Sequence, residues 1–257
     1  MMKSSGTVTR VKLIPVRRHG FPTLVKEPFW LFDDDSVLKA HHLYQQAKAG
    51  GKEAAVELIS DLALEFLVNI KNMLPENAIF VVPHAREATG DNAIPQVLAT
   101  ACAMVTQSQV ETDIVQITRV FHTGADPMER MSLRAEFDGA VIQGAQYILV
   151  DDVTNMGGTL AELANFLLER GGLVSAVVVL VNAGRAKHFH PARTTIKKLK
   201  ERFYNEIEDI FSITPSALTA NEANYLIGFK TADEIRNRLA KARKETCLRL
   251  RSKGIEQ

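Results

Sequence analysis

The stretch "YILVDDVTNMGGTL", residues 147–160, determines how the rest of the chain is interpreted. Its run of apolar residues is typical of a strand buried on both faces of a sheet. Asp151 and Asp152 follow, and then a turn that contains Gly157, Gly158 and Thr159. The segment "TLAELANFLLERGG" that comes next has helical periodicity and ends in glycines. We therefore expect a buried strand, a small-residue loop and a helix, which is the repeating unit of an open parallel sheet.

Other segments extend this pattern in both directions. The predicted strands are 78–83, 113–121, 146–152 and 174–183. Before them, residues 36–74 have the periodicity of two helices broken at Gly50 and Gly51, and a further helix is expected from Ala93 or Pro95 to about Met104. Strands that alternate with helices predict the α/β class, with a central parallel sheet flanked by helices.

Beyond residue 190 only helices are expected. Thr219 with Glu222, and Thr231 with Glu234, fit the capping box, in which each side chain satisfies a backbone N–H group at a helix start. The basic segment 236–253 continues the last of these helices. We therefore divide the chain into an N-terminal arm (1–35), an α/β domain (36–190) and an all-helical C-terminal extension (191–257).

The composition is that of a globular protein of ordinary charge. The 257 residues are 46% hydrophobic, and the 31 basic and 30 acidic residues nearly cancel. Bulk charge therefore gives no reason to expect a nucleic-acid or membrane partner. Cys102 and Cys247 form no CxxC pair, and the longest apolar runs are far shorter than the ~20 residues of a membrane helix. A cytoplasmic location is the expectation.

The loop after the predicted strand suits an anion. In open parallel sheets ligands bind at the carboxyl ends of the strands, where the next helix presents unsatisfied N–H groups. Glycines let the backbone approach a phosphate closely, and Thr159 adds a hydroxyl. Ionised Asp151 and Asp152 suit hydroxyls, a metal ion or both. On spacing alone, the same residues also fit a plain helix start and turn.

The segment "ILVDDVTNMGGTL" resembles the signature of type I phosphoribosyltransferases that binds phosphoribosyl pyrophosphate (PRPP). The order of apolar strand, two acidic residues and small polar loop ending in Thr is the same. "IFVVPHAREATGDNAIPQVLA" stands where that family has its pyrophosphate loop. Residues 119–152 resemble the segment between the flexible loop and the PRPP strand of ComF-like and amidophosphoribosyltransferase-like members. The resemblance covers roughly residues 36–185 and implies the type I phosphoribosyltransferase fold.

The resemblance also implies roles for individual residues. Asp151 and Asp152 would hold the ribose hydroxyls, with Mg2+ nearby, and His84, Ala85 and Arg86 would line the pyrophosphate site. Arg119, Arg130 and Arg134 would belong to a mobile lid that closes over the site. The residues implied to be catalytic are Asp151, Asp152, Arg86 and Arg134. The residues implied to bind PRPP are Asp151, Asp152, Thr154, Asn155, Met156, Gly157, Gly158 and Thr159.

The function that this implies is Mg2+-dependent transfer of phosphoribose to an acceptor that the sequence does not identify. Met156 is a long side chain at a position where the family usually has a small one. One alternative is therefore a non-catalytic accessory protein, in competence or phage defence, that binds PRPP or a nucleotide. A toxin-like nucleotide ribosyl hydrolase is the other.

The segment 236–253 carries eight basic residues and one acidic residue. On a helix it would form a positive stripe that contacts nucleic acid, or pack its apolar face on the domain or on another copy of the chain. We expect a homo-oligomer and no membrane partner.

Overall fold

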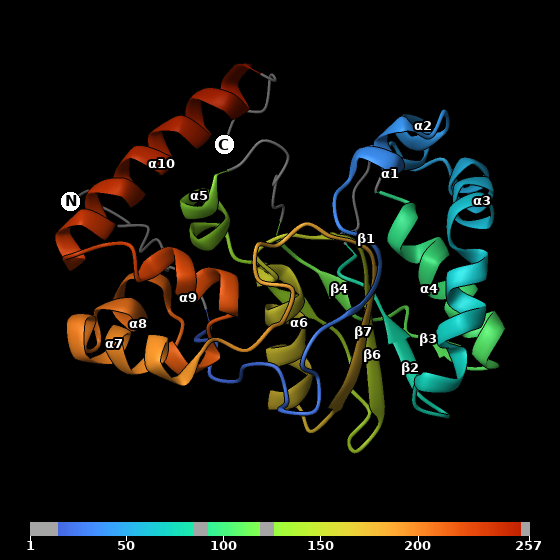
Figure 1. Cartoon of the computed structure of the whole chain (residues 1–257), viewed down its shortest axis with the longest axis horizontal. Coiled ribbons are helices and arrows are strands. Elements are labelled where there is room, and N and C mark those ends of the chain that lie inside the picture. The colour runs from blue at the N-terminus through green and yellow to red at the C-terminus, as the bar shows by residue number, and fades with distance from the viewer. Residues whose placement is uncertain (1–14, 85–91, 119–125, 253–257) are drawn as a thin grey trace, which may run out of the picture.

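The computed structural model describes residues 15–84, 92–118 and 126–252. In these ranges, five strands form a parallel sheet in the order β1-β7-β6-β2-β3, and two more form an antiparallel ribbon (Figure 1). The strands are β1 (Phe29–Phe32), β2 (Ile79–Val81), β3 (Gln109–Val110), β4 (Val115–Gln116), β5 (Phe137–Asp138), β6 (Gln146–Thr154) and β7 (Leu173–Asn182).

The helices lie on both faces of the sheet and in a separate group beyond one face (Figure 1). They are α1 (Ser36–Ala40), α2 (Tyr44–Lys48), α3 (Lys52–Ile70), α4 (Ile94–Thr106), α5 (Pro127–Ser132), α6 (Gly158–Glu169), α7 (Arg193–Phe203), α8 (Glu206–Phe211), α9 (Ala220–Leu226) and α10 (Ala232–Ser252), with short 3-10 turns at Lys71–Met73 and Pro215–Ala217. The α/β class, the central parallel sheet flanked by helices and the helical C-terminal segment are confirmed.

The core consists of two apolar layers that β6 separates. Ile148 and Val150 pack on the side of α3 and α4, whereas Tyr147 and Leu149 pack against α6. Successive side chains of a strand point to opposite faces, so a run of apolar residues is what burial on both faces requires. The expected continuous apolar pattern of 147–150 therefore has a direct structural reason.

Two expectations about the strands are corrected. Residues 113–121 were expected to form a strand of the parallel sheet, but of their described part only β4 is a strand, and it pairs antiparallel with β5. The edge position next to β2 is taken instead by β3. At the opposite edge β1 pairs with β7, although β1 lies inside the predicted N-terminal arm (1–35).

Two predicted helices are each divided into shorter ones. The first half of residues 36–74 forms α1 and α2, which are separated at residues 41–43. Within the region beyond residue 190, where only helices were expected, the periodicity of 196–211 predicts one helix, but it is interrupted at Tyr204, whose φ of 44° is incompatible with a continuous right-handed helix. Both breaks give shorter helices than the sequence pattern predicts.

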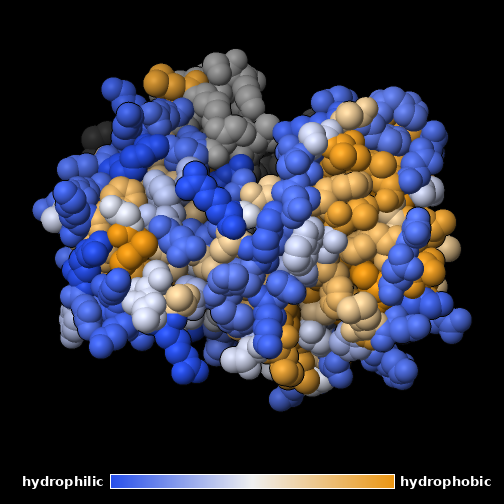
Figure 2. All heavy atoms as spheres, in the orientation of Figure 1, coloured by the Kyte–Doolittle hydropathy of each residue, from blue (hydrophilic) through white to orange (hydrophobic). Residues whose placement is uncertain are grey.

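The C-terminal helices have an apolar core of their own. It gathers side chains from α5 and α7–α10, and Met156 of the loop after β6 belongs to the same cluster. On the opposite side of the molecule, Figure 2 shows apolar residues gathered over the region of α3 and α4, where Val56, Leu64 and Val68 are exposed. Of the helices in the described ranges, not one is long and apolar enough to span a membrane.

Candidate functional site

The loop 155–157 joins the carboxyl end of β6 to the N-terminus of α6. Gly157 adopts the left-handed conformation, with φ of 77°, and its carbonyl accepts the first helical hydrogen bond from Ala161. Glycine takes this conformation without steric cost. The described contacts include no side-chain cap at this helix start. The first N–H groups of α6 are therefore directed at whatever lies in front of the loop, as in an anion site.

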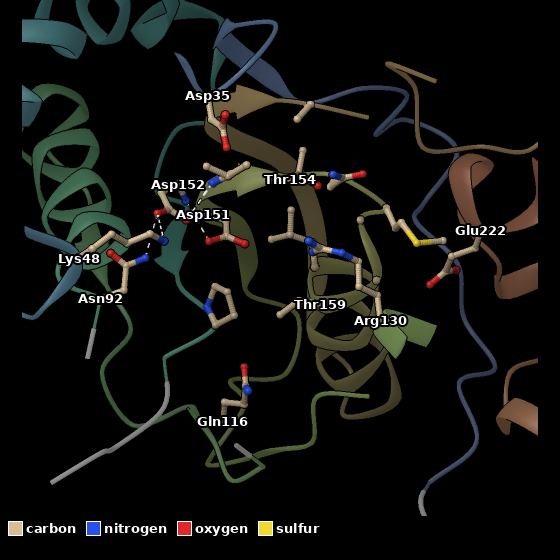
Figure 3. A pocket seen from close by; sticks show the side chains of 18 of the residues that line it. Asp35, Lys48, Asn92, Gln116, Arg130, Asp151, Asp152, Thr154, Thr159 and Glu222 are labelled. Carbon is tan, nitrogen blue, oxygen red and sulfur yellow. Dashed lines mark hydrogen bonds and ion pairs between the residues drawn. The ribbon is translucent and has the colours of Figure 1, made fainter. Parts of the chain in front are cut away.

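The two aspartates that precede the loop differ in their surroundings (Figure 3). The Asp152 Oδ2 atom accepts a hydrogen bond of 2.6 Å from Lys48 Nζ and one of 2.9 Å from Asn92 Nδ2. Its Oδ1 atom accepts from the Val153 N–H group at 2.9 Å. Asp151 is half-buried, and its Oδ1 atom accepts from the Asp152 N–H group at 2.9 Å. Asp152 is therefore held from several sides, and Asp151 from fewer.

The same asymmetry is present in the electrostatics. Burial and the adjacent Asp152 charge raise the pKa of Asp151 well above its usual value. Burial also acts to raise the pKa of Asp152, but the Lys48 charge and the hydrogen bonds from Lys48 and Asn92 outweigh it, so the pKa of Asp152 is lowered. The ion pair with Lys48 therefore favours the ionised form of Asp152, whereas burial disfavours the ionised form of Asp151.

These side chains line a cavity of about 430 Å3 at the carboxyl end of the sheet. Its wall combines the loop after β6 with residues from α1, α2, α5 and α9, and Arg130 of α5 points toward it (Figure 3). The lining residues are Asp35, Lys39, Tyr44, Lys48, Pro83, Asn92, Gln116, Arg130, Met131, Asp151, Asp152, Val153, Thr154, Asn155, Met156, Gly157, Gly158, Thr159, Leu160, Ala183 and Glu222. The volume is within the range of small-molecule sites.

The start of α9 supports the loop from behind. The Thr219 Oγ1 hydroxyl donates to the Met156 carbonyl at 2.6 Å, and the Asn221 Nδ2 amide donates to the Asn155 carbonyl at 3.2 Å. The Met156 side chain is only 7% exposed and packs into the C-terminal apolar core. The long side chain at this position thus has a packing role.

A buried cluster of charges connects this support to the N-terminal segment. The Arg17 guanidinium is fully buried and pairs with Glu222 of α9 and, at 3.2 Å, with Glu162 of α6. It also donates to the Gly158 carbonyl at 3.4 Å. Arg134 forms two hydrogen bonds of 2.7 Å to the two oxygens of Glu162. Two arginines and two glutamates thus balance each other directly behind the loop.

The structure brings only some of the predicted site residues to the cavity. Asp151, Asp152 and the whole run from Thr154 to Thr159 line it, as does Arg130. Arg134 belongs to the buried charge cluster instead. His84 follows Pro83 in sequence but is not among the lining residues, and its Nδ1 atom is 2.5 Å from Gln96 Nε2. Ala85, Arg86 and Arg119 lie outside the described residues.

Several lining residues were not predicted. Lys48 and Asn92 are 104 and 60 residues away from Asp152 in sequence, so no local pattern links them to it. Glu222 was predicted as a capping residue, and it is one, with the reciprocal hydrogen bonds of a capping box to Thr219. Its position in the cavity wall could not be read from that motif.

The described donor atoms fit a magnesium ion that arrives with a substrate. Within the described ranges, no three His, Cys, Asp or Glu side chains are grouped so that they could hold a metal ion. Mg2+ is commonly bound by one or two carboxylates together with substrate phosphates. Asp151 could supply such a carboxylate, and the remaining ligands would be oxygens of the substrate and water.

The basic stripe of α10 is partly neutralised by acidic neighbours. Arg236 pairs with Glu206 and Asp233, and Arg238 pairs with Asp126 and Glu245. The pairing ties α10 to the N-terminal end of α5 and to α8. Binding of nucleic acid through 236–253 stays a prediction, as does the homo-oligomer.

Comparisons with known proteins give partial similarities. No family model matches the chain. It is 34% identical over 213 residues to the protein TraN of Escherichia coli, which covers 80% of this chain and 48% of TraN. It is 29% identical over 97 residues to the adenine phosphoribosyltransferase of Chlorobaculum tepidum, covering 38% of this chain and 48% of that enzyme. The chain thus spans about half the length of each of these relatives.

The chain also has low similarity to solved structures. Adenine phosphoribosyltransferase from Leishmania donovani is similar over 76% of this chain and 87% of that chain, with a TM-score of 0.34 and 15% identity. A TM-score of this size is too low to assign the fold, which rests on the strand order and on the loop between β6 and α6.

Proposed function

We propose that the cavity binds PRPP, or a closely related phosphorylated ribose, and that the chain transfers the phosphoribosyl group to an acceptor. The observation that carries this proposal is the position of Asp151 beside the loop at the N-terminus of α6. One segment thus offers a carboxylate for ribose hydroxyls and backbone N–H groups for a phosphate. The partial sequence similarity to an adenine phosphoribosyltransferase supports the same reading.

In this proposal the 5′-phosphate lies against Asn155–Thr159, and the ribose hydroxyls lie against Asp151. Breaking the bond between ribose C1 and pyrophosphate develops positive charge on the sugar and negative charge on the leaving group. Arg130 and Lys39, which line the cavity, are cations that could face the leaving group. Mg2+, when bound with the substrate, would supply further stabilisation of the pyrophosphate charge.

The buried support behind the loop fits this role. A phosphate site needs its N–H donors fixed before the ligand arrives, because donors that must reorganise contribute less to binding. Here the Met156 and Asn155 carbonyls are each held by a side chain of α9 or its cap. The C-terminal helices would therefore be part of the site, although they follow the α/β sheet in sequence.

The test is calorimetric titration of PRPP, with and without Mg2+, into the wild-type chain and into Asp151→Asn. We expect binding by wild type and a loss of at least about tenfold in the variant, the scale of one charge-assisted hydrogen bond. Asp61→Asn is the matched control, because Asp61 is half exposed on α3 and does not line the cavity. Absence of PRPP binding by folded wild type would refute the proposal.

Measurement of pyrophosphate release then distinguishes a transferase from a hydrolase and from a non-catalytic sensor. A transferase releases pyrophosphate only when an acceptor base is present, so a panel of purine and pyrimidine bases is screened at saturating PRPP. Release without any base indicates a hydrolase. Tight binding with no release under any condition indicates a non-catalytic sensor. Either of these last two results would contradict transfer while leaving the binding site in place.

A further inference from the structure

Of the two adjacent aspartates at the cavity, Asp152 already accepts hydrogen bonds from other groups of the protein. The Asp152 carboxylate is 6% exposed, and its Oδ2 atom lies 2.6 Å from Lys48 Nζ and 2.9 Å from Asn92 Nδ2. Its other oxygen accepts from the Val153 backbone. A carboxylate with three such donors has little acceptor capacity left for a ligand. Figure 3 shows Lys48 and Asn92 approaching Asp152 from the same side.

Asp151 is placed differently. It lines the same cavity but is half-buried, and the backbone N–H group of Asp152 donates to its Oδ1 atom. Asp151 also shares a side-chain hydrogen bond with Asp152, and a carboxyl group with these two contacts still has sites for the hydroxyls of a ribose in either protonation state. Of two aspartates that are adjacent in sequence, the ligand-facing one is therefore Asp151.

The cation at this pair comes from a distant part of the chain. Lys48 ends the short helix α2, and 104 residues separate it from Asp152. Its side chain is 34% exposed, because its ammonium group lies at the cavity wall rather than deep in the core. A divalent ion that used both aspartates would have to displace this ammonium group from Asp152 Oδ2, at the cost of the ion pair.

We propose that Lys48 is a positioning residue of the sugar site, which holds Asp152 in an ion pair so that Asp151 alone receives the ribose diol and the acidic pair takes no divalent cation of its own. This inference rests on the proposed function for the identity of the ligand as a phosphorylated ribose. Mg2+ then enters only as part of the complex with the substrate's pyrophosphate. Asn92 acts with Lys48, because it donates to the same oxygen.

The experiment measures cation binding in the absence of any sugar. Mn2+ is titrated into wild type, Lys48→Met and Lys187→Met, with detection of free Mn2+ by electron paramagnetic resonance. Lys187 is the matched control, because its side chain is also 34% exposed and forms an ion pair of 3.0 Å, but with Asp33, and it does not line this cavity. We expect Lys48→Met to bind Mn2+ about tenfold more tightly than wild type, on the scale of one removed competing charge. Lys187→Met is expected to stay near the wild-type value.

A second measurement addresses the diol with ribose 5-phosphate, which carries no pyrophosphate. We expect Asp151→Asn to weaken its binding more than Asp152→Asn does, because only Asp151 faces the ligand. Thermal melting of every variant confirms that it is folded. If Lys48→Met does not fold, Lys48→Gln replaces it, since its amide removes the charge and keeps most of the length.

The outcomes distinguish this inference from the proposed function. Ribose 5-phosphate binding together with strong Mn2+ binding by wild type, unaffected by Lys48→Met, would overturn the role of Lys48 and leave the function standing. Equal losses in Asp151→Asn and Asp152→Asn would overturn the division between the aspartates. Tighter Mn2+ binding by Lys48→Met with no binding of sugar phosphate would support the role of Lys48 in shielding Asp152 and refute the proposed ligand.

Discussion

Substitution of Arg17 by Met should be among the most destabilising single changes in this chain. Arg17 is 0% exposed, and its guanidinium pairs with Glu222 and Glu162, whose side chains are also buried. Burial alone would lower the pKa of Arg17, but the two carboxylates raise it overall, so the arginine stays charged. Met fills much of the same volume but leaves the carboxylates without one of their two cations.

The magnitude follows from the cost of an uncompensated buried charge. Removing one partner of a buried ion pair destabilises a protein by about 3–5 kcal/mol, whereas an exposed pair contributes about 0–1 kcal/mol. For a chain of this size, 3–5 kcal/mol corresponds to a fall in melting temperature of roughly 6–20 °C. The adjacent Arg18 provides the control, because its side chain is 65% exposed and lies 3.9 Å from Glu169. Arg18→Met should change the melting temperature by only a few degrees.

Urea unfolding followed by circular dichroism measures both variants. The double variant Arg17→Met/Glu222→Gln should recover part of the lost free energy of unfolding, because it removes the unpaired charge and keeps a hydrogen-bonding side chain at position 222. If Arg17→Met unfolds within about 1 kcal/mol of wild type, the cluster does not have the energetic role described here. Equal losses of the free energy of unfolding in Arg17→Met and Arg18→Met would likewise contradict the energetic role of the buried cluster.

Three further predictions concern other sites. Burial raises the pKa of the Cys102 thiol to about 12, so iodoacetamide at pH 8 should label only the exposed Cys247, and mass spectrometry of the native protein showing two adducts would contradict this. Gly157→Ala and Gly144→Ala should each cost about 1–2 kcal/mol, because both glycines have φ near 77°, but only Gly157→Ala should weaken calorimetric binding of ribose 5-phosphate. The raised pKa of Asp151 means that folding favours its protonated form, so its stabilising contribution is lost as the pH rises through the folded pKa. Asp151→Asn should therefore melt above wild type at pH 7, and the difference should shrink below about pH 4; a variant that melts no higher at pH 7 would contradict the sign.

The parts of the fold that sequence predicts well are those whose pattern depends on burial. β6 and β7 are buried on both faces, so their apolar runs are long and unmistakable. β1 is half-buried at the edge of the sheet and has only four residues, which is too short for a period to be recognised. The segment 113–121 has the composition of a strand, but β-propensity does not specify the partner, and here the described part pairs with β5 in a separate ribbon.

In the candidate site, too, features formed by consecutive residues could be predicted, whereas contacts between residues far apart in sequence could not. The loop after β6 was predicted residue by residue, because its strand, glycines and helix start are consecutive in sequence. Nothing in "VDDV" distinguishes the first aspartate from the second, since both precede the same loop. Their difference arises from Lys48 and Asn92, which reach Asp152 only after α2 and the start of α4 have packed against the sheet. A single sequence can show that two carboxylates are present, but not which of them accepts hydrogen bonds from distant residues of the folded chain.

Met156 shows how contacts that cannot be predicted from sequence change a functional interpretation. In sequence it is a long side chain at a small-residue position of a phosphate loop, which favours a loss of activity. In the structure it is buried among the C-terminal helices, and its carbonyl accepts from Thr219, the cap of α9. A small residue at 156 would leave a cavity in that apolar core, at a cost of about 2–5 kcal/mol for a change to Ala. The methionine is therefore explained by attachment of the loop to the C-terminal helices, and its presence is compatible with a phosphate bound on the other side of the loop.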